Sequence, residues 1–97
     1  MGTMQVIEDL SKKYGVSLEE LIRAGVELAL KERKKPYLCE RLEILARYGV
    51  SNVQELEERI QRGEVPDHPA WEDLIDVKNL DAEVKESDGD LGTVHAA

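Results

Sequence analysis

The sequence predicts an all-α protein, a small bundle of four or five helices. Apolar residues recur at helical spacing in five segments, and glycine or proline follows or begins most of these segments. Phe is absent, and β-branched residues never alternate with polar ones over the length of a strand. A chain of 97 residues is typical of one domain. We therefore expect a single helical domain over residues 1–86 and a disordered tail over residues 87–97, where the helical period is lost.

The first two helices are expected over residues 4–14 and 17–35. The first carries Val6, Ile7 and Leu10 on one side and ends at Gly15. The second opens with a capping box, Ser17-Leu18-Glu19-Glu20, in which the Ser17 side chain accepts from a free backbone N–H. Its apolar surface is wider than one stripe, which indicates a central helix or a dimer seam. We expect a homodimer through helix 17–35.

Three more helices follow in the prediction. Pro36 fits the first turn of a third helix over residues 37–48, and a fourth runs from Asn52 to Gly63. The fifth starts at Pro69 within an acidic helical segment, residues 64–86. There, Trp71, Leu74 and Ile75 are predicted to face the core. The predicted core consists of Leu21, Ile22, Leu28, Leu42, Leu45, Leu56, Ile60 and Trp71.

Two predicted helix-turn-helix corners have the same four-residue sequence. Tyr14-Gly15-Val16-Ser17 recurs as Tyr48-Gly49-Val50-Ser51, and each copy is followed by Glu-Leu. Either the same favourable corner occurs twice, or a helical hairpin is duplicated. Two copies are fewer than a solenoid needs.

Negative charge is concentrated in the last third of the chain. Residues 1–35 carry seven basic and six acidic side chains, residues 36–62 carry four and five, and residues 63–97 carry two and ten. Such asymmetry is typical of an interaction segment and disfavours nucleic acid binding there. We expect a basic protein partner to bind Trp71, Glu72, Asp73 and Asp76. Trp71 is either an interface anchor or a core residue that ties the last helix to the bundle.

The alternative is a nucleic acid-binding regulator of the helix-turn-helix type. Its basic surface would consist of Lys31, Arg33, Lys34, Lys35, Arg41 and Arg47. Cations in the last turn of a helix also stabilise the helix dipole, which is the ordinary explanation for such a run. The helices that follow the corners begin with carboxylates (Glu19, Glu20, Glu55), and these oppose entry into a DNA groove. A continuous basic face would favour nucleic acid, whereas scattered charges would favour a protein partner.

No motif indicates an enzyme, a cofactor or a metal site. Cys39 is the single cysteine, and His68 and His95 lack the spacing of metal ligands. No apolar run reaches the ~20 residues of a membrane span. We expect a cytoplasmic protein without catalytic residues.

Residues 6–35 resemble ribbon-helix-helix antitoxins and repressors. The resemblance rests on a short helix, Tyr-Gly-Val-Ser, then Leu-Glu-Glu-Leu-Ile-Arg and an aliphatic helix with a basic end. It implies dimerisation through the second helix and a C-terminal segment that wraps a toxin. That family reads DNA with an N-terminal ribbon, and the five residues before Val6 are too few for a ribbon followed by a first helix. We therefore expect the DNA-binding half to be missing or altered. The sequence therefore predicts a non-catalytic, antitoxin-like interaction module.

Overall fold

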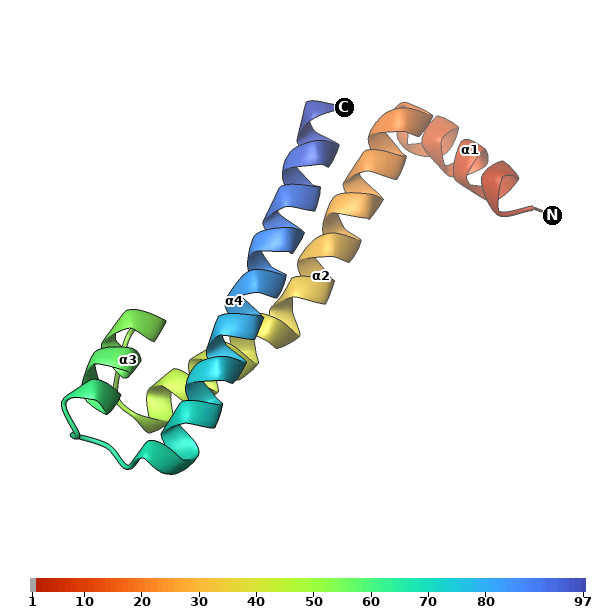
Figure 1. Cartoon of the computed structure of the whole chain (residues 1–97). Coiled ribbons are helices and arrows are strands. Elements are labelled where there is room, and N and C mark those ends of the chain that lie inside the picture. Colours follow the sequence, from red (N-terminus) through yellow and green to blue (C-terminus); the bar gives the residue numbers. More distant parts are fainter. Residues whose placement is uncertain (1) are drawn as a thin grey trace.

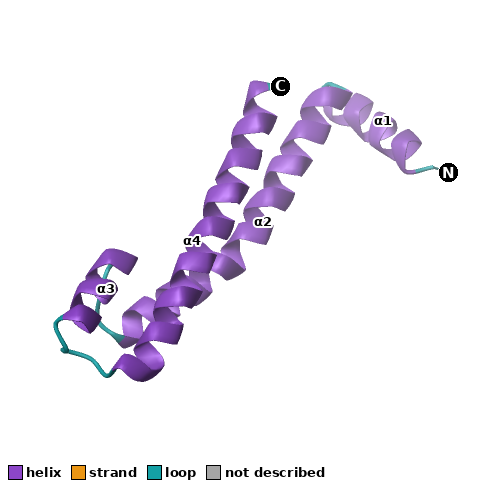
Figure 2. Cartoon of the chain, in the orientation of Figure 1, coloured by secondary structure: helices purple, strands orange, loops and turns teal. Residues whose placement is uncertain are grey.

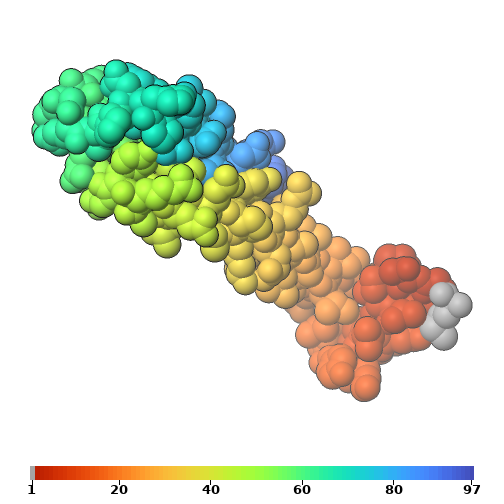
Figure 3. All heavy atoms as spheres, turned by 90° about the horizontal axis from the view of Figure 1, so that it is seen from below, coloured from red at the N-terminus to blue at the C-terminus, as the bar shows by residue number. Residues whose placement is uncertain are grey.

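The computed structural model describes residues 2–97, and it consists of four helices joined by short loops (Figures 1 and 2). The helices are α1 (Thr3–Tyr14), α2 (Leu18–Arg47), α3 (Val53–Gln61) and α4 (Asp67–Ala96). No residue within 2–97 lies in a strand, so the all-α prediction is confirmed. The molecule is elongated, at 62 × 25 × 18 Å, and α1 and α3 lie at its opposite ends (Figure 3).

The two long helices α2 and α4 run antiparallel along one another (Figure 1). Their facing residues repeat with alternating steps of three and four, the spacing of a coiled coil. Every one of these residues is buried or half-buried. On α2 and its C-cap Tyr48 they are Arg23, Glu27, Leu30, Lys34, Tyr37, Arg41, Ile44 and Tyr48, which we call the inner seam. On α4 they are Ala70, Asp73, Val77, Leu80, Val84, Ser87, Leu91 and Val94.

The main apolar core lies at the α3 end of this hairpin. It contains Ile44, Leu45, Val50, Leu56, Ile60, Ala70, Leu74, Val77 and Leu80. The predicted burial of Leu45, Leu56 and Ile60 is confirmed, and Leu21 is half-buried.

Four other predicted core residues are exposed, and for them the prediction was wrong. Leu28 is 63% exposed, Leu42 67%, Ile22 41% and Trp71 41%; Ile75, predicted to face the core, is 55% exposed. The physical reason is that each long helix has one long neighbour, which covers one face. The most apolar face of α2 is turned away from α4.

Pro36 does not begin a third helix. It lies inside α2, which continues from Leu18 to Arg47. A proline in a helix removes one backbone donor and costs roughly 3 kcal/mol, because the carbonyl four residues earlier loses its hydrogen bond. Residues on both sides of Pro36, among them Lys34, Tyr37 and Arg41, lie on the inner seam and contact α4. Packing along α4 thus keeps the helix continuous.

Residues 87–96 also differ from the expected disordered tail. They form the last turns of α4, which ends at Ala96. Leu91 is buried, Val94 is half-buried, and the Thr93 hydroxyl donates to the Gly89 carbonyl over 3.1 Å. Regular helical geometry begins at Pro69, as predicted, because His68 has an extended backbone.

The two Tyr-Gly-Val-Ser corners have the same local hydrogen bonding. Gly15 and Gly49 both adopt positive φ, and the N–H groups of Val16 and Val50 donate to carbonyls five residues earlier. This pattern is the Schellman helix ending. Gly63 ends α3 with the same hydrogen-bond pattern, although the Tyr-Gly-Val-Ser sequence is absent there. The corners therefore share a general helix ending, and a duplicated hairpin stays a prediction.

Candidate interaction surfaces

A ladder of ion pairs joins α2 to α4. Three of the predicted basic residues pair with carboxylates of α4: Arg47 with Asp73, Arg41 with Asp81 and Lys34 with Asp88. At the next step His95 Nε2 lies 3.0 Å from Glu27 Oε1. Successive steps along each helix are six to eight residues, so each rung lies about two turns from the last. The two surfaces predicted as separate are therefore joined in part: three of the six predicted basic residues bind α4, and Asp73 and Asp81 of the acidic segment bind α2.

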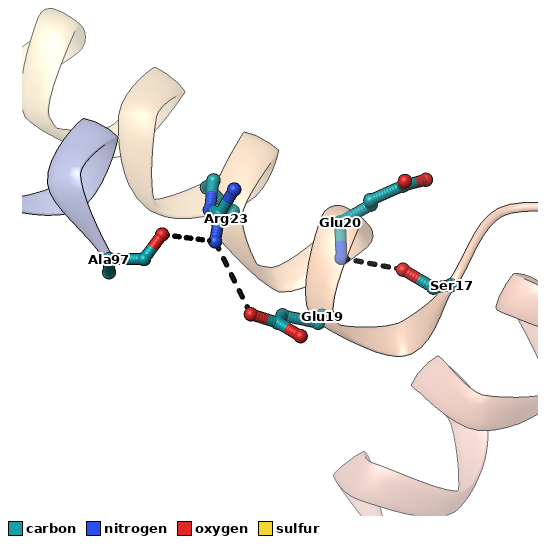
Figure 4. Close-up of polar contacts among 5 residues, drawn as sticks. All are labelled: Ser17, Glu19, Glu20, Arg23 and Ala97. Carbon is teal, nitrogen blue, oxygen red and sulfur yellow. Dashed lines mark hydrogen bonds and ion pairs between the residues drawn. The ribbon is translucent and has the colours of Figure 1, made fainter.

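The ladder ends at Arg23. Its Nη2 donates to the Ala97 oxygen over 2.7 Å and lies 3.3 Å from Glu19 Oε1 (Figure 4). In the same turn the Glu20 N–H donates to Ser17 Oγ over 3.1 Å, so the predicted N-cap is confirmed (Figure 4). The start of α2 is thereby held both to its own cap and to the last residue of the chain.

The remaining basic candidates do not form a continuous basic face. Lys35 Nζ lies 2.7 Å from Glu32 Oε1, and this hydrogen bond raises the pKa of Lys35. Within residues 2–97, Lys31 and Arg33 make no ion pair, but Arg33 lines a cleft with three carboxylates. Four of the six basic candidates are therefore held in ion pairs within the chain.

Asp73 was predicted as a partner-binding residue, and its carboxylate is buried instead. The Tyr48 hydroxyl donates to Asp73 Oδ2, and Arg47 Nη1 lies 3.5 Å from Oδ1. Burial, followed by the bond to Asp73, raises the pKa of Tyr48 to about 12. Arg59 Nη1 donates to the Tyr48 carbonyl over 2.7 Å, which connects α3 to the same cluster. Asp73 therefore holds α2, α3 and α4 together and is not free to meet a partner.

The other predicted partner residues are exposed, but they do not share one face. Trp71 and Asp76 are five residues apart, which places them about 140° apart around the helix. Glu72 and Asp76 lie on the same side of α4, and Glu72 Oε1 is 2.8 Å from His68 Nδ1. Trp71 belongs to the other side, where Lys78 pairs with Glu57 of α3. The tryptophan and the carboxylates form two separate features.

Sequence reasoning missed an acidic stripe along α4. Asp76, Glu83 and Asp90 recur every seven residues, and Glu72 and Glu86 lie on the same side. We call these five residues the acidic stripe; all five are exposed. Within residues 2–97, Asp76, Glu83, Glu86 and Asp90 make no ion pair. The signal in the sequence was the seven-residue spacing of the carboxylates.

Large apolar side chains are also exposed at the end formed by α1 and the start of α2. Met4, Val6, Leu10, Val16, Ile22 and Val26 are each more than one-third exposed. Between the two helices lies an open hollow of about 460 Å³, lined by Ile7, Leu10, Leu21, Ile22, Gly25, Val26 and Ala29. An exposed apolar surface of this kind is typical of an interface.

Residues 2–97 contain neither a metal-binding cluster nor a membrane-spanning helix. Among residues 2–97 no group of three His, Cys, Asp or Glu side chains could hold a metal ion, and Cys39 is exposed. None of the described helices combines the length and the apolar character needed to cross a bilayer.

The chain is an all-helical protein built on a hairpin of two long helices, and it exposes an apolar surface and an acidic stripe. Residues 4–88 match the model of the Uncharacterized protein MJ0235 family, and the chain belongs to that family. Comparison with curated proteins and with solved structures gives no significant match.

Proposed function

We propose that the protein is a non-catalytic interaction module that binds a basic protein through the acidic stripe of α4. The observation that carries this proposal is the unequal pairing of charge. The ladder pairs three of the six predicted basic residues with α4, whereas four carboxylates of the stripe make no ion pair within residues 2–97. Arg33 lines the same cleft as Glu83, Glu86 and Asp90 without pairing with them. The chain's formal charge of −8 adds to the negative potential around the stripe.

The stripe has the dimensions of a protein-binding site. From Glu72 to Asp90 it spans 18 residues of helix, or roughly 27 Å at 1.5 Å per residue. Carboxylates arranged in this way steer a basic surface into contact and orient it, which affects the association rate more than the final affinity. An antitoxin-like role with a basic toxin is one form of this proposal. The resemblance to ribbon-helix-helix proteins stays a prediction.

The alternative function, nucleic acid binding through residues 31–47, has less support. It needs free cations on one face, and Lys34, Arg41 and Arg47 pair with α4. Phosphate contacts by these residues would require the ladder to open, because each cation would exchange its carboxylate for a phosphate.

The proposal is tested by capture from native cell extract with the full chain immobilised, with and without nuclease treatment. We expect a basic protein to be retained after nuclease treatment. With that protein purified, the double variant Glu83→Gln/Asp90→Asn should associate at least several-fold more slowly at low salt, and the difference should shrink as salt rises.

The matched control is Glu20→Gln/Glu58→Gln, which removes the same charge from exposed positions off the stripe. It should change the on-rate much less than the stripe variant does. Capture that disappears with nuclease, or equal on-rates for the two double variants, would contradict the proposal.

A further inference from the structure

Helix α2 carries a second coiled-coil stripe on the side away from α4. Each member lies two residues before a member of the inner seam, about 160° around the helix. This outer seam consists of Leu21, Gly25, Leu28, Glu32, Lys35, Cys39, Leu42 and Ala46. Leu21 is half-buried, and the other seven residues are exposed. The outer seam has the spacing of a helix–helix interface and lacks a neighbouring helix.

We propose that the outer seam pairs with the outer seam of a second copy of the chain, with the two α2 helices antiparallel. The twofold axis passes between Glu32 and Lys35. Large residues then meet small ones: Leu42 packs onto the partner's Gly25, Leu28 onto the partner's Cys39, and Leu21 onto the partner's Ala46. Alternation of large and small residues lets facing helices interlock, as in a well-packed core. This proposal does not depend on the acidic stripe or its partner.

Charge selects both the direction and the register of the pair. In the proposed register Glu32 lies opposite the partner's Lys35, and Lys35 lies opposite the partner's Glu32. A shift of one heptad in either direction would place Glu32 against the partner's Leu28 or Leu42. A parallel pair would place each residue against its own copy, so carboxylate would face carboxylate and ammonium would face ammonium. Both alternatives cost electrostatic energy that the antiparallel register avoids.

The hollow between α1 and α2 receives the partner in this arrangement. Leu21 and Gly25 belong both to the outer seam and to the lining of the hollow. Figure 1 shows α1 on the side of α2 opposite α4. The hollow therefore lies on the side of the outer seam, and in the proposed register the partner's Leu42 packs beside Gly25 of its lining. The apolar side chains Ile7 and Leu10 of α1 would then cover it.

Gly25 supports the proposed pairing of two outer seams independently of the charges. A glycine inside a helix costs about 1 kcal/mol relative to alanine. At Gly25 an added Cβ would meet no atom within 4 Å in the single chain. Nothing inside one copy therefore requires a glycine here. A partner's leucine packed onto the backbone would require one.

The first test uses charge reversal and mixing. Glu32→Lys places Lys against the partner's Lys35, and Lys35→Glu places Glu against the partner's Glu32. Each variant should dimerise at least tenfold more weakly than the unmodified chain in sedimentation equilibrium. An equimolar mixture of the two should recover dimers, because opposite charges then face one another. Because mixing leaves the contacts within each chain unchanged, recovery reports contact between chains. Monomers of the unmodified chain at high micromolar concentration, or no recovery on mixing, would overturn the proposal.

The second test determines direction with the natural cysteine. In the antiparallel register Cys39 lies opposite the partner's Leu28, and the two Cys39 residues are offset by about 16 Å along the helix axis, too far for a disulfide. Under mild oxidation Leu28→Cys should form disulfide-linked dimers, with the new cysteine joined to the partner's Cys39. The unmodified chain and the off-seam control Arg33→Cys should remain largely unlinked. Efficient Cys39–Cys39 linkage in the unmodified chain would indicate a parallel pair and overturn the register.

A third variant separates folding from pairing. In the single chain an added Cβ at Gly25 meets no atom within 4 Å, and Gly25 lines an open hollow of about 460 Å³. The helical content and melting temperature of Gly25→Leu should therefore be at least those of the unmodified chain. Its dimerisation should weaken at least tenfold, because the new side chain occupies the place of the partner's Leu42. Unweakened dimerisation of Gly25→Leu would show that the interface lies elsewhere.

Discussion

The hydroxyl of Tyr48 donates a hydrogen bond to the buried carboxylate of Asp73, and this contact joins the end of α2 to the start of α4. Arg47 forms an ion pair with the other carboxylate oxygen of Asp73, and Arg59 of α3 donates to the Tyr48 carbonyl. A buried carboxylate is costly without such partners, since an unpaired charge loses its solvation. The cluster explains how an acidic residue can occupy a core position of the hairpin.

The Tyr48 hydroxyl should ionise at a higher pH than an ordinary tyrosine. Burial and the Asp73 bond raise its pKa to about 12, from an ordinary value near 10. Because the folded pKa is the higher one, its stabilising contribution is fully present below about pH 10. It is lost as the pH rises from about 10 to 12. Ultraviolet absorbance should show a tyrosinate step near pH 12 that Tyr48→Phe lacks and Tyr14→Phe retains. Persistence of that step in Tyr48→Phe would contradict the assignment.

Leu45→Ala should lower the free energy of unfolding by about 2–5 kcal/mol, because Leu45 is 2% exposed and its loss leaves a cavity. Urea titration followed by circular dichroism measures the change. Ile75→Ala is the control, since that side chain is more than half exposed and should cost under about 0.5 kcal/mol. Equal losses in the two variants would mean that Leu45 is not in the core.

The ion-pair ladder predicts coupling between α2 and α4 that a double-mutant cycle can measure. Arg41→Asp and Asp81→Arg should each destabilise the protein, because each places like charges opposite one another. The double exchange should recover stability, with a coupling energy of about 1 kcal/mol, since the pair is partly exposed. Additive losses would show that these two residues do not face one another in solution.

Pro36→Ala tests whether α2 is continuous. Alanine restores the backbone donor inside the helix, so the free energy of unfolding should rise by about 1–3 kcal/mol in urea titration. Pro69→Ala is a useful contrast, because that proline opens the regular part of α4, where no donor is missing. A loss of stability in Pro36→Ala would indicate two helices that meet at residue 36, as the sequence alone predicted.

The sequence by itself determined the features that depend on neighbouring residues. The helical class follows from local periodicity. The starts at Ser17 and Asn52 follow from side chains that accept from a backbone N–H three residues later. The ends at Gly15, Gly49 and Gly63 follow from the ease with which glycine adopts positive φ. Each of these interactions spans only a few residues.

Only the tertiary structure decided which face of α2 lies inside. The inner seam contains Glu27, Lys34 and Arg41, and the sequence alone marks such residues as exposed. They are half-buried because α4 supplies His95, Asp88 and Asp81 at matching steps. The outer seam is more apolar and was therefore mistaken for core, as Leu28 and Leu42 show. Likewise, the sequence alone predicts that Asp73 is an exposed charge. In the fold, Tyr48, 25 residues earlier, donates a hydrogen bond to its buried carboxylate. A charge is tolerated inside a protein when a partner distant in sequence offsets its lost hydration, and only the fold reveals that partner.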